Sequence, residues 1–443
     1  MNFRKTVFQI ALPITIQSLV QASFSVIDQI MTGQLGSVSV AAIGLGGKFS
    51  SLFSVVVAAI ATVAGIVFAQ YIGSGDKNGV SRMFTINTAV ISAISIVFQF
   101  FSMAVPLGIM SLYSKDEATI AAAGGYLFII AIGFLPQALS LLMSSLFRCQ
   151  GNASFPLFAS LAAAVINTAL NYILIFGHMG MPGLGVEGAA IATTASRFAE
   201  FLILAVFMLH KIKRSEFSLK FTRSQKNGEF KMFICILLPM LATEFLWSLG
   251  ENVYAVIYGR IGTDECAAMT LTNPIQSLMI GAMTGLSAAS GIIIGRLLGE
   301  GNEAEAYSNS KKFIKYGFIG SIALSAVLLL SRSLYVEIFN VNDNVKNLTG
   351  LILIAYAIIA PIKVENMILG GGIIRSGGKT KYIMAVDIIG TWGFGVPLGL
   401  ISAFVLHLPI YAVYFILSLE ECVRFAITLW IFKRKKWMNN LAA

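Results

Sequence analysis

The chain has 443 residues, of which 57% are hydrophobic and only 12% are charged, and its mean hydropathy is +0.81. Soluble globular proteins carry roughly 25% charged residues, so this composition excludes a soluble enzyme. The net charge of +10 raises nucleic acid as a partner, and the positions of the cations must decide that question. The four cysteines lie far apart without a CxxC motif, which argues against a disulfide framework or a metal knuckle.

Twelve hydrophobic segments are long enough to cross a bilayer, which takes about 20 apolar residues per helix. The first segment is too long for a signal-peptide core and has no A-x-A cleavage site, so we expect it to remain as the first helix. The sequence therefore predicts an all-α integral membrane protein with twelve transmembrane helices. They are expected near residues 7–31, 40–70, 83–110, 120–147, 155–177, 186–210, 232–258, 267–295, 313–331, 348–374, 382–406 and 408–432.

The cations follow the positive-inside rule when the N-terminus is placed in the cytoplasm. Most of the 31 Lys and Arg residues then lie at cytoplasmic helix ends and in cytoplasmic loops. The pattern predicts a multi-pass protein of the cell (plasma or inner) membrane with both termini cytoplasmic. The largest basic groups lie at 211–231 and 433–436, and we expect membrane lipids with anionic headgroups, not nucleic acid, as their partners.

The second half of the chain repeats the first at an offset of 226 residues, which pairs Pro13 with Pro239. A later match pairs the motif that begins at Arg148 with the motif that begins at Arg375, at an offset of 227. Because six helices separate equivalent points, both copies enter the membrane in the same orientation and a pseudo-two-fold axis should lie along the membrane normal. We predict two six-helix lobes and a basic cytoplasmic linker: residues 1–210, 232–443 and 211–231, respectively.

The first helix carries a polar stripe. Gln17, Gln21, Ser25 and Asp28 follow one another at spacings of 4, 4 and 3, which places them on one helix face. Lipid does not tolerate such a face, so it must look inward, and ionisable groups at this depth are functional candidates. We expect the two glutamines to contact cargo and Asp28 to hold a coupling ion.

Three neutral residues on two other helices are expected at the same depth as Asp28, in the outer half of the bilayer. They are Asn167, Asn171 and Thr193. A single carboxylate among neutral oxygens suits a proton or a weakly held Na⁺, and the four residues would be metal ligands only if Na⁺ is the ion. The alternative is a hydrogen-bonded polar plug between helices.

In the second half, Glu244 and Glu251 lie seven residues apart on one face of the helix at 232–258. No lysine or arginine shares that face within the helix, so the pair is predicted to attract a cation. Trp247 and Tyr254 neighbour the two acids, and aromatic faces attract organic cations, although ring packing is the commoner explanation. The predicted substrate-binding set also includes acids of later helices, Glu365 and Asp387. Lys363 needs a partner elsewhere, for which Asp387 is the candidate.

Several stretches resemble the multidrug and toxic compound extrusion (MATE) transporters. They include LPITIQSLVQASFSVIDQIMTGQLG and LPMLATEFLWSLGENVYAVIYGRIG, which open the two halves, and also QYIGSGD, FRCQGNASFP, NTALNYILIFG and GLGVEGAAIATTASR. The resemblance implies a twelve-helix, two-lobed exporter of cationic and amphipathic compounds, driven by inward movement of Na⁺ or H⁺.

The resemblance also assigns residues. Asp28 matches the acid of the family's first helix, Asn167 its helix 5 asparagine, and Thr193 its helix 6 threonine. Asn171 departs from the pattern, because members with a cation site in the first lobe have Asp there, which places more of the work on Asp28. Family members with a glutamate on the helix that corresponds to residues 232–258 have it nearer Trp247. The substrate-binding role of Glu244 and Glu251 therefore rests more on their charge and spacing than on the resemblance.

Two other functions compete with export of cations. Flippases of lipid-linked oligosaccharides belong to the same superfamily, but they must hold a pyrophosphate, whereas acids outnumber bases within the predicted helices. A membrane-embedded enzyme needs a nucleophile and base or a metal cluster, yet the three histidines lie at predicted helix ends without paired spacing. We therefore expect a transporter and not an enzyme, without a cofactor apart from H⁺ or Na⁺, acting as a monomer.

Overall fold

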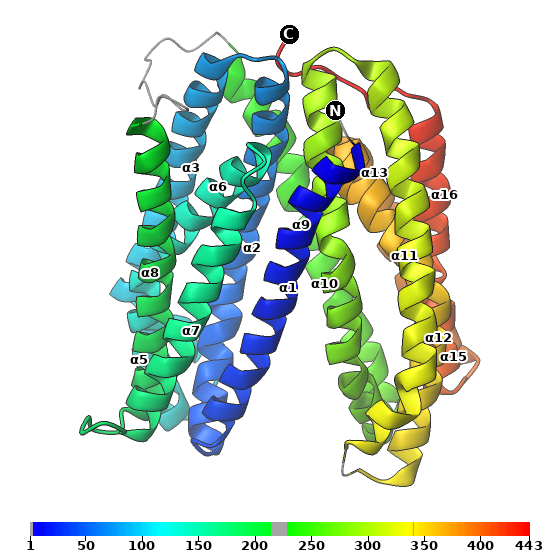
Figure 1. Cartoon of the computed structure of the whole chain (residues 1–443). Helices are drawn as coiled ribbons and strands as arrows, with labels where there is room; N and C mark the ends of the chain where they lie inside the picture. The colour runs from blue at the N-terminus through cyan, green and yellow to red at the C-terminus, as the bar shows by residue number, and fades with distance from the viewer. Residues whose placement is uncertain (1–2, 214–227, 340) are drawn as a thin grey trace. The chain divides into compact units, whose positions relative to one another are not determined.

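The computed structural model describes residues 3–213, 228–339 and 341–443, and these residues are helical almost throughout, with no strand among them (Figure 1). The helices of the first half are α1 (Phe3–Gly33), α2 (Ser37–Gly73), α3 (Lys77–Ala104), α4 (Pro106–Ser111), α5 (Glu117–Ile132), α6 (Phe134–Cys149), α7 (Ser154–Phe176) and α8 (Gly185–Lys213).

The second half contains both α-helices and π-helical segments, which are named η1 to η3. Its helices are α9 (Glu229–Ile261), α10 (Thr263–Gly299), α11 (Glu303–Glu337), α12 (Asp343–Asn366), η1 (Met367–Ile374), α13 (Thr380–Asp387), η2 (Ile388–Gly395), α14 (Val396–Leu400), η3 (Ile401–Val405), α15 (Ile410–Ser418) and α16 (Glu420–Lys433).

The twelve predicted segments each coincide with helix. Within the described residues, ten helical stretches are long and apolar enough to cross a membrane, and α5 and α6, which meet at an angle of 45°, add an eleventh as a bent pair. The short helices α15 and α16 occupy the place of the last predicted segment. The prediction of an all-α membrane protein with twelve spans is confirmed.

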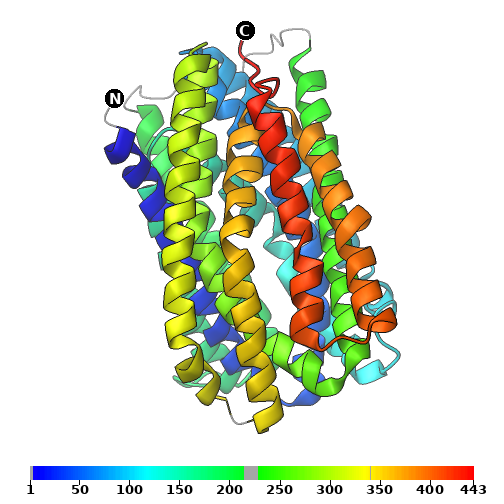
Figure 2. The same ribbon diagram turned by 90° about the vertical axis from the view of Figure 1, so that its right-hand side faces the viewer.

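The chain divides into two compact units, residues 16–230 and residues 1–15 together with 231–443. In the unit of residues 16–230, α2 packs against α3, α5 and α6, and α7 packs against α8. In the other unit, α12 packs against α10, α11, α15 and α16; Figure 2 shows α11, α12 and α16 side by side. The predicted lobes follow from the sequence repeat and stay a prediction, and residues 214–227 of the predicted linker lie outside the described chain.

The sequence repeat reappears in the packing of small residues. A Cβ atom on Gly65 of α2 would lie 2.7 Å from the Ser145 hydroxyl oxygen of α6. At the matched place in the other unit, a Cβ atom on Gly291 of α10 would lie 3.3 Å from the carbonyl oxygen of Gly372 in η1. Small residues let helix backbones approach closely where lipid supplies no hydrophobic driving force. The two glycines therefore hold equivalent helix contacts in the two units.

Candidate functional site

The structure brings Asp28 of α1 together with Asn167 and Asn171 of α7 and Thr193 of α8. The Asn171 side-chain amide donates to Asp28 Oδ1 at 2.6 Å and to Asn167 Oδ1 at 3.2 Å. The Asn167 amide donates to Thr193 Oγ1 at 3.5 Å, and the Thr193 hydroxyl donates to the carbonyl oxygen of Ala189 at 2.9 Å. The four residues that the sequence singled out thus form one hydrogen-bonded network.

The network combines one carboxylate with neutral amide and hydroxyl groups. Asn171 is fully buried, while Asp28, Asn167 and Thr193 are half-buried. The Asn171 side-chain oxygen is buried and has no hydrogen-bond partner among the described residues. Carboxylate, amide and hydroxyl oxygens therefore lie together where a small cation or a proton could bind, and the bond from Asn171 to Asp28 joins α7 to α1.

The rest of the polar stripe on α1 behaves differently. Gln17 is buried and its side-chain oxygen accepts a hydrogen bond of 2.8 Å from Arg148 Nη2 of α6, whereas Gln21 and Ser25 are exposed. Gln17 lies eleven residues before Asp28, which is about 16 Å along a helix at 1.5 Å per residue. Gln17 therefore belongs to a separate contact and not to the Asp28 network.

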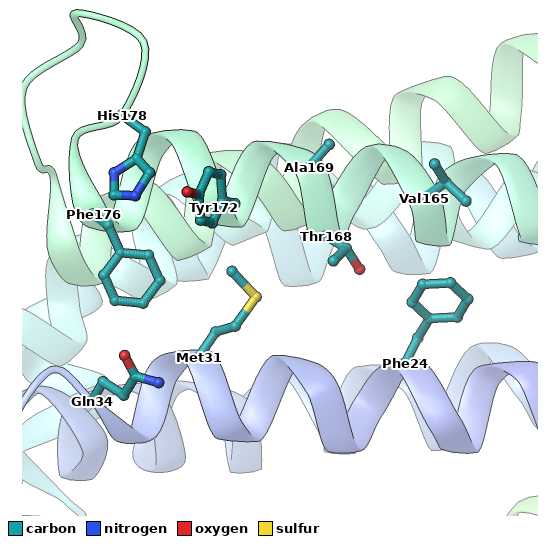
Figure 3. Close-up of a pocket in the computed structure, with 9 residues that line it drawn as sticks. All are labelled: Phe24, Met31, Gln34, Val165, Thr168, Ala169, Tyr172, Phe176 and His178. Atoms are coloured by element: carbon teal, nitrogen blue, oxygen red, sulfur yellow. The ribbon is translucent and has the colours of Figure 1, made fainter.

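An open apolar groove lies between α1 and α7, the two helices that the Asp28–Asn171 bond joins. Its volume is about 790 Å³, and Figure 3 shows Phe24 and Met31 of α1 facing Thr168 and Tyr172 of α7. His178 lies at one end of the groove, where its ring meets the Tyr172 ring at a centroid distance of 4.1 Å. No sequence pattern indicated this groove, because ordinary apolar residues of two distant segments form it.

A second, smaller cavity of about 210 Å³ lies in the unit that contains α9 to α16. Its charged groups are contributed by α9, α12 and α16. Among the described residues that line it there are three carboxylates and one ammonium group, and tyrosine rings lie beside them. The residues that matter here are Glu251, Tyr254, Tyr258, Lys363, Glu420 and Glu421. The sequence had predicted Glu251 and Tyr254 as substrate-binding, but not the other four.

Two of the cavity carboxylates are held by neighbours. Lys363 Nζ lies 3.9 Å from Glu421 Oε1, and the Asn366 amide donates to Glu421 Oε2 at 2.8 Å. The Tyr254 hydroxyl donates to Glu420 Oε2 at 2.7 Å. The expectation that Lys363 pairs with Asp387 is wrong, because the ammonium group of this α12 residue lies beside Glu421 of α16.

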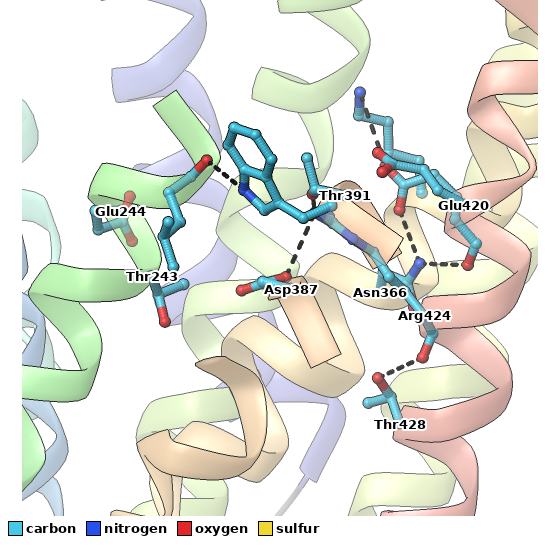
Figure 4. Close-up of polar contacts among 12 residues, drawn as sticks. Thr243, Glu244, Asn366, Asp387, Thr391, Glu420, Arg424 and Thr428 are labelled. Carbon is cyan, nitrogen blue, oxygen red and sulfur yellow. Dashed lines mark hydrogen bonds and ion pairs between the residues drawn. The ribbon is translucent and has the colours of Figure 1, made fainter. Parts of the chain in front are cut away.

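The remaining predicted acids of this unit lie outside the cavity lining. Glu244 Oε1 is 3.6 Å from Arg375 Nη2. Asp387 Oδ1 is 3.6 Å from Arg424 Nη2, and Arg424 also donates to the Thr391 hydroxyl (Figure 4). Each of these acids therefore faces an arginine in this structure.

Glu365 and Trp247 are also placed away from the cavity. Glu365 is only 2% exposed, and neither of its carboxylate oxygens has a hydrogen-bond partner among the described residues. It faces Gly317 of α11, where an added Cβ atom would lie 2.7 Å from Glu365 Oε1. Trp247 is 47% exposed and does not line the cavity. The structure thus separates the predicted substrate-binding residues of this unit into cavity-lining and other groups.

The contact between Arg375 and Glu244 repeats a contact of the first half of the chain. Arg375 contacts Glu244 in one unit, and Arg148 contacts Gln17 in the other. The two arginines are separated by 227 residues, and so are Gln17 and Glu244. The sequence showed the 227-residue offset for the two arginines. That each arginine contacts the polar residue just after Pro13 or Pro239 became visible only in the structure.

The family model MatE matches residues 13–173 and 239–401, which is most of the chain and falls in both halves. The chain belongs to the MATE family. The match therefore confirms the resemblance that the sequence showed, and it identifies a multi-pass membrane transporter.

Relatives of this MATE protein match along nearly their whole length. The uncharacterized transporter YisQ of Bacillus subtilis is 23% identical, with 98% of this chain and 95% of the relative covered. Proteins described as probable multidrug resistance protein NorM are 23% identical in Thermotoga maritima, with 98% and 93% covered, and 26% identical in Bacillus cereus, with 88% and 86% covered.

Solved structures show the same MATE fold. A MATE protein in complex with MaL6 has a TM-score of 0.90 at 19% identity, with 98% of this chain and 97% of that chain covered. A transporter of the MOP superfamily from Pyrococcus furiosus has a TM-score of 0.88 at 19% identity, with 98% and 96% covered.

Proposed function

We propose that this MATE transporter exports cationic and amphipathic organic compounds in exchange for inward H⁺ or Na⁺, by alternating access. The observation that carries the proposal is the charge of the cavity that Glu251, Glu420, Glu421 and Lys363 line, where three carboxylates face one ammonium group. A lining with excess negative charge, partly withdrawn from water, favours a cation over an anion.

The cavity also offers the apolar and aromatic surface that an organic cation needs. Tyr254 and Tyr258 are buried in the lining, and aromatic faces attract organic cations. Since Lys363 pairs with Glu421 and Tyr254 donates to Glu420, Glu251 is the carboxylate of the lining to which the structure gives no such partner among the described residues. We assign to Glu251 the main charge contact with cargo.

The coupling ion is assigned to Asp28. It is the carboxylate of the network with Asn167, Asn171 and Thr193, and it accepts a charge-assisted hydrogen bond from another helix. A proton or Na⁺ at this carboxylate changes the local charge by one unit and competes with the Asn171 amide for Asp28 Oδ1. An ion can drive a transporter only by binding its states with different affinity, and a contact between α1 and α7 gives such a difference a structural basis.

The relatives support the proposed cargo, because several are described as probable multidrug resistance proteins. We further propose that the protein is a monomer in the cell membrane with both termini cytoplasmic, where its basic segments contact anionic lipid headgroups.

Transport by the purified protein in proteoliposomes tests the cargo class. We expect efflux of ethidium, an aromatic monovalent cation, and no movement of a labelled lipid-linked oligosaccharide. Movement of the labelled lipid without efflux of ethidium would replace the proposal by a flippase. The variant Glu251→Gln should lose most ethidium efflux, with Glu244→Gln as its matched control because Glu244 faces Arg375 outside the cavity lining.

A further inference from the structure

Lys363 places a positive charge in a cavity that otherwise carries acids. It lies on α12 two residues after Pro361, and its side chain is 35% exposed while it lines the cavity beside Glu251 and Glu420. Its ammonium group lies 3.9 Å from Glu421 Oε1. A charged group within a membrane span raises the free energy of the folded protein, and an ion pair of 3.9 Å offsets this cost only in part. The presence of Lys363 therefore calls for a functional reason.

The two partners of this ion pair are held to different degrees. Glu421 is 8% exposed, and the Asn366 amide donates to its other carboxylate oxygen at 2.8 Å. Lys363 is a compact point charge on a flexible four-carbon stem. The carboxylate therefore keeps its place while the ammonium group can move away from it.

We infer that Lys363 is a specificity-determining residue: a built-in counter-cation that balances one carboxylate of the cavity and thereby limits how much positive charge the cargo can carry. With Lys363 present, cargo with one positive charge meets Glu251, and a second cationic group has to compete with the lysine for Glu421. Without the ammonium group, Glu421 becomes available to a second cationic group of the cargo. The inference rests on the proposed function, because it concerns the charge of the exported compound.

The expected effect follows from Coulomb's law. Within a protein, one unit charge several ångströms away changes the affinity for each cationic charge by about tenfold or more. When the lysine charge is removed, the affinity for a monocation rises by this factor once. The affinity for a dication rises by the factor for each of its two charges. The ratio of the two affinities should therefore change by about tenfold in favour of the dication.

Binding of ethidium and propidium to the purified full-length protein tests this inference, because the two dyes share a ring system and carry one and two positive charges. The dissociation constants are measured by fluorescence for the wild type, Lys363→Met, Lys363→Gln and Lys363→Arg. Lys381→Met is the matched control, since Lys381 is an exposed lysine on α13 outside the cavity lining.

We expect Lys363→Met and Lys363→Gln to raise the affinity for propidium relative to ethidium by about tenfold. Lys363→Arg and Lys381→Met should keep the wild-type ratio. An unchanged ratio in a neutral variant that elutes and melts like the wild type overturns the inference, and so does a loss of propidium affinity. If the wild type binds neither dye, the proposed function fails together with the inference. If the wild type binds ethidium but substitution of Lys363 leaves the ratio of propidium to ethidium affinity unchanged, only the inference fails.

Discussion

The Asn171 side-chain amide of α7 donates a hydrogen bond of 2.6 Å to the Asp28 carboxylate of α1. This bond joins two helices of the first half through the group that is assigned to the coupling ion. An ion that binds Asp28 therefore acts on the contact between the helices as well as on the charge of the site.

The first prediction concerns the charge of Asp28. Asp28→Asn keeps the shape of the side chain but cannot exchange a charge, so gradient-driven efflux of ethidium should fall to the background rate. Ethidium binding should stay within about twofold of the wild type, because the cavity of the other unit is unchanged. Ser25→Ala, on the same face of α1 and exposed, is the control. Uphill efflux at the wild-type rate in Asp28→Asn would move coupling to the acids of the second half.

The second prediction restores the family's aspartate at position 171. Asn171→Asp places a second carboxylate against Asp28, and two carboxylates that share a site either retain a proton or attract a cation. We expect efflux by this variant to depend on Na⁺ more strongly than efflux by the wild type. Rates are compared across a Na⁺ series at fixed pH. A sodium dependence equal to that of the wild type would show that residue 171 does not control ion choice.

The third prediction separates two acids that the sequence treated as a pair. Glu251 lines the cavity, whereas Glu244 faces Arg375 at 3.6 Å. Glu251→Gln should raise the KM for ethidium by about tenfold or more through loss of one charge contact. Glu244→Gln should leave KM nearly unchanged and lower the melting temperature, because the part-buried Arg375 loses its ion pair with Glu244. The double variant Glu244→Gln with Arg375→Gln should recover part of that stability. A rise in KM in Glu244→Gln equal to that in Glu251→Gln would contradict this assignment.

The fourth prediction concerns the start of α9. Glu229 is buried, and its carboxylate accepts hydrogen bonds from Arg82 of α3 at 2.9 Å and from the Tyr71 hydroxyl of α2 at 3.2 Å. Removal of one partner from a buried ion pair costs about 3–5 kcal/mol. Glu229→Ala should therefore lower the melting temperature clearly, whereas Glu300→Ala, at an exposed helix end, should not. Equal melting temperatures for the two variants would show that the Arg82–Glu229 contact adds little stability.

The number and positions of the helices could be predicted because membrane spans are read from hydrophobicity alone. The Asp28 network could also be predicted, because polar residues that lipid excludes must face one another at a common depth. The bend between α5 and α6 and the π-helical η1 were not indicated, since the hydrophobic pattern runs through both without interruption.

The cavity residues were predicted less well, for a physical reason. Helix periodicity shows which side chains share a face, as for Glu244 and Glu251, but not which residues of other helices lie opposite. Arg375 lies opposite Glu244, and Glu421 lies opposite Lys363, across contacts between segments far apart in the chain. A charge without a partner on its own helix can therefore be neutralised by a residue of another helix. This is the case for Glu244, which faces Arg375, whereas Glu251 lines the cavity.

Uphill transport of ethidium in proteoliposomes under an imposed ion gradient tests the central claim most directly. The dye is supplied at equal concentration on both sides, and a pH gradient and then a Na⁺ gradient is applied. We predict that ethidium accumulates against its own gradient under at least one of the two, that an ionophore for that ion abolishes the accumulation, and that Asp28→Asn does not accumulate the dye. Absence of accumulation under both gradients, with ethidium binding intact, would contradict an antiporter of organic cations.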